Sequence, residues 1–354
     1  MERRKNTEEI LPLFDHVNVA NVADVASICG DSAPVGHENI DLGKFFGKSF
    51  KGLEMQVPVF SGGNQYFGKP IENYVFEEKS LRQYLSFMDN NDGDALYLYG
   101  PSGCGKTSAI NQIAAVLQHP VISITLNGRF ELADLIGHQT VINGEVVFVH
   151  GPLSRAMKYG YILIMNEIDL ADAAELAGLN DVLEGRSLVV IQNNGEVIPP
   201  HPDFRLIVTA NTAGTGSTRG SYHGTQHLNA AFLDRFRFIP CDYMAAKDEE
   251  ELLRKSSPKL SEKTITGMVR VANEIRKSHV YPEANHVYMT MPLTTRSLLR
   301  WARLTCSYSF EESPLKTALS HAFTGRLSSE ESEYVHRLVD DVFGSISMEE
   351  LFVA

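Results

Sequence analysis

Short, nearly continuous runs of apolar residues alternate with amphipathic stretches over the middle of the chain. Such runs are typical of parallel strands that are buried on both faces, and the stretches between them have the spacing of helices. Strands are expected at residues 95–99, 121–126, 161–165 and 205–210. The pattern therefore predicts an α/β fold in which helices flank a parallel sheet, as in P-loop nucleotide-binding domains.

From about residue 246 onward, apolar residues recur only at helical spacing. This change predicts an all-helical domain after the sheet. Its helices are expected at residues 248–254, 262–278, 293–306, 315–324 and 328–342.

The first 94 residues have a weaker pattern. Residues 17–29 form a short amphipathic stretch, residues 30–36 read as a turn-rich break, and residues 76–88 have helical spacing. We therefore expect four parts, which are an N-terminal arm (1–43), an extension leading into the core (44–94), an α/β nucleotide-binding domain (95–243), and a helical lid domain with acidic C-terminal helices (244–354).

Residues 100–107 read Gly-Pro-Ser-Gly-Cys-Gly-Lys-Thr, a complete G-x-x-x-x-G-K-[ST] phosphate loop between a predicted strand and a predicted helix. Glycines let successive backbone N–H groups wrap around phosphate oxygens, and the helix N-terminus adds its dipole. Lys106 is expected to meet the β- and γ-phosphates, and the Thr107 hydroxyl to bind Mg²⁺. The motif predicts an ATP site formed by Gly100, Pro101, Ser102, Gly103, Cys104, Gly105, Lys106, Thr107 and Ser108.

The strand at 161–165 is followed by Asn166, Glu167 and, two residues later, Asp169. In P-loop ATPases, acidic residues at this strand end hold Mg²⁺ and orient water. Glu167 has the position of the water-polarising carboxylate, whereas Asn166 stands where a metal-associated aspartate is expected. An amide can contact Mg²⁺ through a water but supplies no charge, which is expected to slow hydrolysis. The alternative is that Glu167 and Asp169 only cap a helix.

Two further polar residues are candidates for contact with the γ-phosphate. Asn211 follows the strand at 205–210 and can position the attacking water, although the same residue type also occurs in Asx turns. Arg296 lies in the first turn of a predicted helix, where an arginine is unfavourable unless an anion compensates. A bound phosphate is such an anion, and a structural ion pair is the alternative.

Arg235 comes at the end of a short predicted helix in the segment Leu233-Asp234-Arg235-Phe236. An arginine at this place can reach the γ-phosphate of a neighbouring subunit and stabilise charge in the transition state. The alternative is that Arg235 or Arg237 pairs with Asp234 or Asp242.

The chain carries 44 acidic and 32 basic residues, a formal net charge of −12. This balance disfavours dedicated nucleic-acid binding, because the negative charge would repel a phosphate backbone. No apolar run approaches the roughly 18 residues of a membrane span, and the charged start lacks a secretory signal. The cysteines at 29, 104, 241 and 306 contain no C-x-x-C pair, which favours reduced thiols in the cytoplasm.

The order of these motifs resembles that of the AAA+ ATPases. Within them it is similar to the MoxR group, and most similar to the ATPase subunits of aerobic cobaltochelatases (CobS-like). The resemblance covers roughly residues 44–307. It is carried by residues 129–137, 200–212, 222–226 and 295–302.

The resemblance implies a ring, usually a hexamer, with ATP between subunits. It gives Lys106 and Thr107 the phosphate-loop role and Glu167 the catalytic role, makes Asn211 the first sensor and Arg296 the second, and makes Arg235 an arginine finger. The family pattern usually has an aspartate where this chain has Asn166.

Members of the family also carry two β-hairpin insertions that face the ring pore or a partner. Residues 141–149 and 188–198 have the strand–Asn-Gly–strand signature of such hairpins. The alternative is that they are ordinary hairpins of the core fold.

The sequence thus predicts an enzyme, a ring-forming AAA+ ATPase that hydrolyses ATP with Mg²⁺ to remodel a partner protein. By resemblance, the partner would be a von Willebrand A-type (VWA) protein with a metal-dependent adhesion site, acting on a client enzyme in metal insertion or maturation. One alternative is an ATP-gated scaffold with little hydrolysis, suggested by Asn166. The other is a DNA-dependent ATPase of a restriction or replication system, which the acidic balance disfavours.

Overall fold

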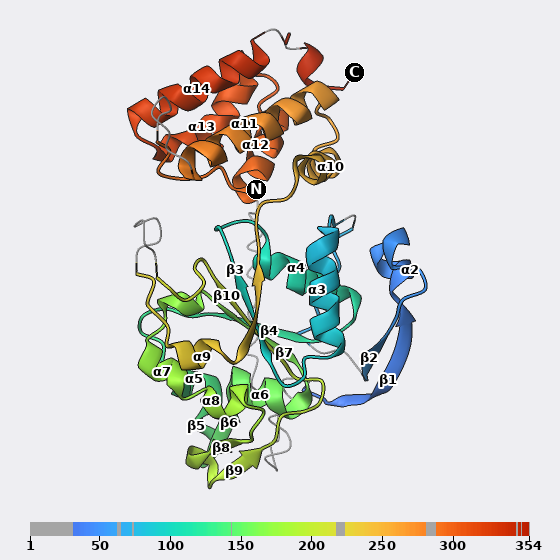
Figure 1. Cartoon of the computed structure of the whole chain (residues 1–354), viewed down its shortest axis with the longest axis vertical. Coiled ribbons are helices and arrows are strands. Elements are labelled where there is room, and N and C mark those ends of the chain that lie inside the picture. The colour runs from blue at the N-terminus through green and yellow to red at the C-terminus, as the bar shows by residue number, and fades with distance from the viewer. Residues whose placement is uncertain are drawn as a thin grey trace, which may run out of the picture.

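The computed structural model describes residues 31–61, 65–72, 74–142, 144–216, 224–280, 288–344, 346–347 and 349–353. An α/β body is followed along the chain by a helical body (Figure 1). The amphipathic stretch predicted at 17–29 lies outside the described residues. No helix within them is both long enough and apolar enough to cross a membrane.

A five-stranded parallel sheet forms the centre of the α/β body, with the order β11-β3-β10-β7-β4. Its strands are β3 (Ala95–Tyr99), β4 (Val121–Thr125), β7 (Ile162–Asn166), β10 (Arg205–Ala210) and β11 (Phe236–Pro240). The sheet confirms the predicted fold class, and β11 is an addition that the pattern did not indicate. The carboxyl ends of parallel strands lie at one edge, so the segments after β3, β7 and β10 come together there.

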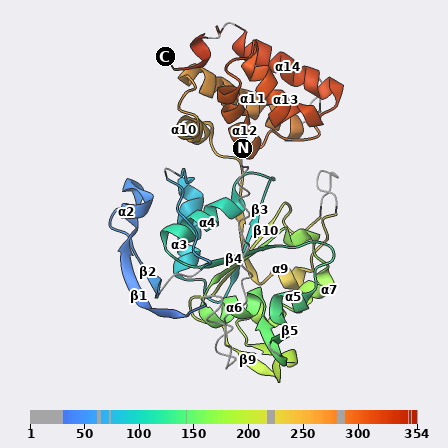
Figure 2. The ribbon, with the colours of Figure 1, turned by 180° about the vertical axis from the view of Figure 1, so that it is seen from behind.

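Helices cover both faces of the sheet (Figures 1 and 2). On one face, α3 (Glu78–Asp89) and α4 (Lys106–Val116) share a core with Leu98 and Ile164. The opposite core, around Leu163 and Val208, contains side chains of α6 (Pro152–Tyr159), α7 (Ala173–Ala177), α8 (Asn180–Leu183) and α9 (Ala230–Leu233). Because both faces are covered, the central strands are apolar at nearly every position.

An antiparallel hairpin of β1 (Pro34–Asp41) and β2 (Glu54–Phe60) precedes the sheet and was not predicted. Its strands are joined by α2 (Leu42–Phe46) and the 3₁₀ turn η1 (Lys48–Phe50). The break expected at residues 30–36 is therefore partly a strand, and the hairpin spans the expected boundary at residue 43. Most side chains of β1 are exposed, so no apolar alternation marks it in the sequence.

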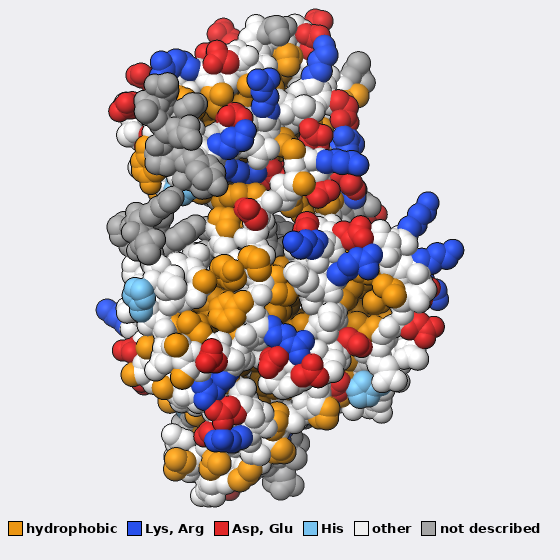
Figure 3. All heavy atoms as spheres, viewed as in Figure 1, with side chains coloured by type: hydrophobic (Ala, Val, Ile, Leu, Met, Phe, Trp, Pro, Cys, Tyr) orange, Lys and Arg blue, Asp and Glu red, His pale blue; other side chains and the backbone are white. Residues whose placement is uncertain are grey.

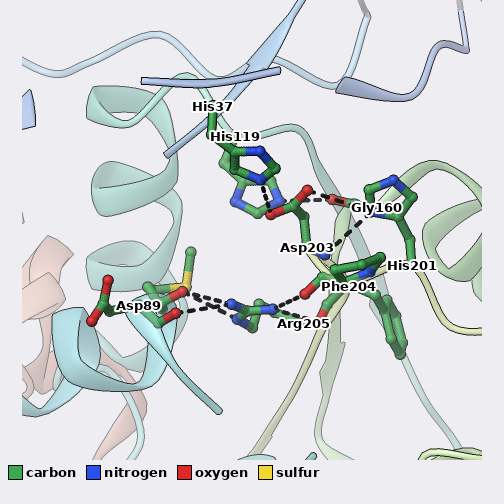
Figure 4. Close-up of polar contacts among 10 residues, drawn as sticks. His37, Asp89, His119, Gly160, His201, Asp203, Phe204 and Arg205 are labelled. Atoms are coloured by element: carbon green, nitrogen blue, oxygen red, sulfur yellow. Dashed lines mark hydrogen bonds and ion pairs between the residues drawn. The ribbon is translucent and has the colours of Figure 1, made fainter. Parts of the chain in front are cut away.

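Polar contacts fasten this hairpin and α3 to the start of β10 (Figure 4). His37 Nε2 of β1 lies 2.8 Å from Asp203 Oδ1, just before β10. The Arg205 guanidinium donates to the carbonyl of Met88 at 2.8 Å and to that of Pro202 at 2.8 Å. Since Arg205 is almost fully buried, these carbonyls supply the partners that its donors need.

Both predicted hairpins of the α/β body are present. The first pairs β5 (Gly137–Ile142) with β6 (Glu145–His150) after α5 (Leu132–Ile136), and the second pairs β8 (Leu188–Val190) with β9 (Glu196–Ile198) around η3 (Ile191–Asn193). They lie at the end of the α/β body far from the helical body (Figure 1). Gln139 Nε2 donates to the carbonyl of Gln192 at 2.8 Å, which joins the two hairpins.

The helical body has its own apolar core around the fully buried Trp301. Its helices agree with the predicted ranges to within two residues at each end. They are α10 (Ala246–Ser256), α11 (Glu262–Val280), α12 (Thr295–Ser307), α13 (Pro314–Ala322) and α14 (Ser329–Phe343), with the 3₁₀ turns η4 (Thr324–Arg326) and η5 (Glu349–Leu351).

Candidate nucleotide-binding site

The phosphate loop runs from the end of β3 to the start of α4, as the motif predicted. Gly100 has φ +149° and Gly103 has φ +71°, and both positions are closed to a side chain. A Cβ atom at Gly100 would lie 1.9 Å from the Cys241 carbonyl oxygen, and one at Gly103 would lie 2.8 Å from the Thr294 Cβ. Helix α4 begins at Lys106, so its N-terminal amides follow the loop directly and can meet an anion.

Lys106 folds over the loop with its ammonium among oxygen acceptors. Its Nζ donates to the carbonyls of Gly100 at 2.7 Å and Pro101 at 3.1 Å, and to Asn211 Oδ1 at 3.3 Å. The contact with Asn211 joins the loop to the segment that follows β10. A phosphate group at the loop would compete with these neutral acceptors for the ammonium.

Asn211 also contacts Glu167. Its Nδ2 donates to Glu167 Oε2 at 2.7 Å, so one amide bridges the Lys106 ammonium and the Glu167 carboxylate. Glu167 has φ +57°, a left-handed conformation that is uncommon for a residue with a side chain and that occurs at functional sites. Partial burial, and then the charge of Asp169, raise the pKa of Glu167. A raised pKa makes this carboxylate a stronger base than an exposed glutamate.

Asn166 connects the loop to two strands. Its Oδ1 accepts hydrogen bonds from the hydroxyls of Thr107 at 2.6 Å and Thr209 at 3.2 Å. Its Nδ2 donates to Ser123 Oγ at 3.0 Å and to the carbonyl of Ile124 at 2.9 Å, both on β4. The structure therefore brings Thr107 and Asn166 together, and their role at a Mg²⁺ ion stays a prediction.

Asp169 has a role that sequence reasoning did not identify. It is fully buried, and its Oδ2 accepts hydrogen bonds from the backbone N–H of Asn211 at 3.0 Å and of Thr212 at 3.2 Å. Its Oδ2 thus fixes the segment after β10, whereas its Oδ1 is buried and has no hydrogen-bond partner among the described residues.

The residues present fit a Mg²⁺ ion that is bound mainly through phosphate oxygens. Thr107 offers a hydroxyl, and Asn166 offers an amide oxygen beside it. The two nearby carboxylates, of Glu167 and Asp169, are engaged by Asn211 and by the backbone after β10. A carboxylate at the end of β7, which Mg²⁺ sites of this kind use, is replaced by a neutral group.

Arg235 comes after Asp234, the C-cap of α9, and its guanidinium forms an ion pair with Glu184, at the end of α8. Arg237 pairs with Asp94 at 2.6 Å and with Asp92 at 2.9 Å. The partners expected as the structural alternative, Asp234 and Asp242, are therefore not the ones found. A role of Arg235 toward a neighbouring subunit stays a prediction.

Arg296 is exposed in the first turn of α12, at the edge of the helical body that meets the phosphate loop. Thr294, the N-cap of α12, packs against Gly103 of the loop. The Arg296 charge is near enough to Glu167 to be among the influences that lower its pKa. Arg296 therefore lies on the side of the site that the helical body covers, and its role as a second sensor stays a prediction.

Tyr243 makes a second contact between the two bodies. Its hydroxyl donates to the carbonyl of Ser102 in the phosphate loop at 3.2 Å. The Arg276 guanidinium carbon of α11 lies 4.1 Å from the centre of its ring. Arg276 is in turn bound to the buried Glu249 at 2.7 Å, and Thr295 at the start of α12 donates to Glu249 at 2.6 Å. Loop, connecting segment and helical body are therefore one continuous set of contacts.

A cavity of about 440 Å³ opens beside the phosphate loop. Its size suits a nucleoside, and it is partly apolar as base sites usually are. Sequence reasoning missed it, although aromatic residues before α3 were a possible signal. Among the residues that line it are Tyr74, Phe76, Tyr84, Lys106, Cys241 and Tyr243.

The described cysteines, at positions 104, 241 and 306, are free thiols. Cys104 and Cys241 both line the cavity beside the loop. Burial raises the pKa of Cys241 to about 11 and also raises that of Cys104. These two groups are therefore neutral thiols near pH 7.

Comparison with known proteins agrees with this geometry. Residues 95–236 match the family described as AAA domain (dynein-related subfamily), and residues 249–342 match the CbbQ/NirQ/NorQ C-terminal family. The chain therefore belongs to the AAA+ ATPases of the CbbQ and MoxR type, which are ATP-hydrolysing enzymes.

Two relatives illustrate the relationship. Aerobic cobaltochelatase subunit CobS of Sinorhizobium sp is 28% identical over 258 residues, which are 70% of this chain and 76% of that protein. An uncharacterised protein of Staphylococcus aureus (strain USA300) is 30% identical over 198 residues, 52% of this chain and 72% of its own length. Among solved structures, the Thermotoga maritima RuvB Holliday junction branch migration motor aligns with a TM-score of 0.42. It is 16% identical over 80% of this chain and 74% of that chain, a likeness too weak to bear on function.

Proposed function

We propose that this chain binds ATP with Mg²⁺ at the phosphate loop, hydrolyses it, and uses the turnover to remodel a partner protein. The observation that supports hydrolysis best is the Asn211 amide, which links the Lys106 ammonium to the Glu167 carboxylate. This arrangement gathers a phosphate-binding cation, a base and a polar amide at the edge of the sheet where the phosphate loop begins. Such a set is what transfer of a phosphoryl group to water requires.

In this proposal each residue has one task. Backbone N–H groups of the phosphate loop and of the start of α4, together with the Lys106 ammonium, bind the phosphates, and Arg296 approaches them from α12. When bound, Mg²⁺ neutralises part of the phosphate charge, with Thr107 as a ligand and Asn166 beside it. Glu167 accepts a proton from the attacking water, which Asn211 helps to orient.

We further propose that subunits form a ring, expected to be a hexamer, in which Arg235 serves the site of the next subunit. We also propose a partner of the VWA type, which the family resemblance implies, and a client enzyme in metal insertion or maturation, which the relation to a protein named as a cobaltochelatase subunit supports. The free thiols beside the loop support a cytoplasmic location.

The two hairpins offer a surface for that partner. Aliphatic side chains on them are between 53% and 79% exposed, and Figure 3 shows hydrophobic side chains at this end of the molecule. Exposed apolar groups gathered in one place commonly mark protein contacts. The residues are Val141, Val146, Val189, Ile191 and Val197.

A second candidate is a scaffold that binds ATP and assembles but hydrolyses slowly. The neutral Asn166 favours it, because the charge that usually faces the metal is missing. Phosphate release by the wild-type protein separates the two candidates.

The decisive experiment replaces the base. We expect Glu167→Gln to lower the rate of phosphate release by at least about 100-fold, because general-base catalysis is lost. Affinity for ATP, measured by calorimetry, should change by less than about threefold, since the substitution is nearly isosteric.

Glu330→Gln is the matched control, because Glu330 is an exposed glutamate of α14. It should leave both quantities unchanged. A wild-type protein that binds ATP without turnover would instead establish the scaffold.

A further inference from the structure

All of the hydrogen-bonding capacity of the Asn166 side chain is used. Its oxygen accepts two hydrogen bonds, from Thr107 and Thr209, and its nitrogen donates two, to Ser123 and Ile124. The contact with Ile124 fixes which atom is the nitrogen, because a backbone carbonyl can only accept. The position is therefore built around an amide.

An aspartate in the same place would not reproduce these contacts. One of its carboxylate oxygens would face the Ile124 carbonyl oxygen at about the 2.9 Å that Nδ2 now has. Two acceptors at that distance repel each other, and a partly buried polar group without a partner is costly. The Ser123 hydroxyl can turn to donate, but the carbonyl of Ile124 cannot.

The surrounding charges also favour binding of a triphosphate that carries no metal ion. Lys106 brings a positive charge to the loop, and Arg296 adds another from α12. The side chain at position 166, which contacts Thr107, adds no negative charge, and the Glu167 carboxylate that follows it is hydrogen-bonded by the Asn211 amide. A triphosphate without a metal ion is strongly negative, and such a site attracts it rather than repelling it.

We propose that Asn166 makes this an ATP site without a carboxylate at the position that contacts Thr107, in which nucleotide binding depends little on a divalent cation. Asn166 acts as a positioning residue that orders the Thr107 hydroxyl and joins β7 to β4. The inference rests on the proposed ATP binding and adds to it how the site treats the metal ion.

The test compares the full-length wild type with Asn166→Asp in excess Mg²⁺ and in excess EDTA, each with and without adenylyl imidodiphosphate. Calorimetry measures the affinity for this nucleotide, and thermal unfolding is followed in all four conditions. In the wild type we expect the affinity to differ by less than about fivefold between Mg²⁺ and EDTA.

For Asn166→Asp we expect a lower melting temperature without nucleotide. We also expect binding at least about tenfold weaker in EDTA than in Mg²⁺, because the new carboxylate repels the bare triphosphate and attracts the metal ion. The nucleotide should therefore stabilise this variant well only when Mg²⁺ is present.

Asn229→Asp is the matched control. It makes the same change of charge at the exposed N-cap of α9, where the two residue types are about equally favourable. We expect it to retain both the melting temperature and the Mg²⁺ dependence of the wild type.

Three results would overturn the inference. They are a wild-type affinity that falls more than about 100-fold in EDTA, an Asn166→Asp variant as stable as wild type, or an unchanged Mg²⁺ dependence in that variant. If Asn166→Asp does not fold, the comparison of Mg²⁺ and EDTA in the wild type still decides. A wild type that binds no nucleotide in either condition contradicts the proposed function itself.

Discussion

His119 is a single residue whose protonation state is set by burial. It is almost fully buried, and its Nε2 lies 2.8 Å from the carbonyl oxygen of Gly160 (Figure 4). Burial lowers its pKa to about 4 from an ordinary value of 6.5. The neutral ring is therefore the form that the folded protein holds, with its N–H donating to Gly160.

This lowered pKa predicts a loss of stability in acid. Below pH 6.5 the unfolded chain takes up a proton at His119 that the folded chain refuses, so stability is full above pH 6.5 and falls toward pH 4. We expect the contribution to reach about 3 kcal/mol near pH 4. His119→Gln, which keeps an N–H donor but does not titrate, should show a shallower decline in urea unfolding between pH 7 and 4. If stability declined equally with falling pH in the wild type and in His119→Gln, the lowered pKa of His119 would be contradicted.

The site residues that sequence could predict are those whose roles follow from their place beside a strand. Lys106, Glu167 and Asn211 each lie at or just after the end of a strand or loop, and the structure brings these three together. The partners of Arg235 could not be predicted, because Glu184 is 51 positions away and meets it only through the packing of α8 and α9. The role of Asp169 could not be predicted for a similar reason, since its hydrogen-bond donors are backbone N–H groups of another segment.

Among the elements, the connection between β11 and α10 does more than join two bodies. Tyr243 lies in it and contacts the phosphate loop with its hydroxyl and Arg276 of α11 with its ring. Arg276 is held by the buried Glu249, which also binds Thr295 at the start of α12. These contacts form a continuous path from the loop to the helix that carries Arg296, and we expect a shift of the loop to be transmitted along it.

Replacing Tyr243 should uncouple the phosphate loop from helix α12. In Tyr243→Leu, which loses both contacts, we expect nucleotide no longer to slow hydrogen exchange in α12. Tyr243→Phe keeps the ring over Arg276 and loses one hydrogen bond, so it should keep that response and bind nucleotide no more than about tenfold more weakly. Phe310→Leu, at a residue of the helical body that is 78% exposed, is the control. An undiminished response in Tyr243→Leu would refute the coupling.

Elements with a buried face were predictable, and those without one were not. The core strands and the helices after residue 246 have strong apolar patterns, and the predictions match them closely. Strand β1 is mostly exposed and owes its existence to pairing with β2, so its sequence alone carries no signal. The cavity beside the loop also escaped, because it forms from distant segments that include Tyr74, Cys104 and Cys241.

At the scale of the whole molecule, the proposed ring requires catalytic groups from two subunits. Glu167 lies at the chain's own phosphate loop, whereas Arg235 is anchored to Glu184 at the end of α8. For Arg235 to act on the next subunit, it must exchange this ion pair for phosphate, which is feasible for a partly exposed pair of modest strength.

Mixing two inactive variants tests this division of labour. We expect Glu167→Gln and Arg235→Ala each to lower phosphate release at least about 100-fold on its own. Mixed rings should regain part of the activity, because some interfaces combine an intact glutamate with an intact arginine. The absence of any recovery, in mixtures shown by light scattering to contain both subunits in one ring, would place both groups in a single chain's site.

Gly100 stands so close to the carbonyl of Cys241 that the phosphate loop and the chain leaving β11 share one narrow space. A methyl group there would push away the very segment that leads into the helical body. Glycine is therefore required at this position for two reasons. The loop must wrap around the anion, and the segment that leads into the helical body must pass close to the Gly100 backbone. A substitution of Gly100 would therefore displace the segment that joins the two bodies as well as weaken phosphate binding.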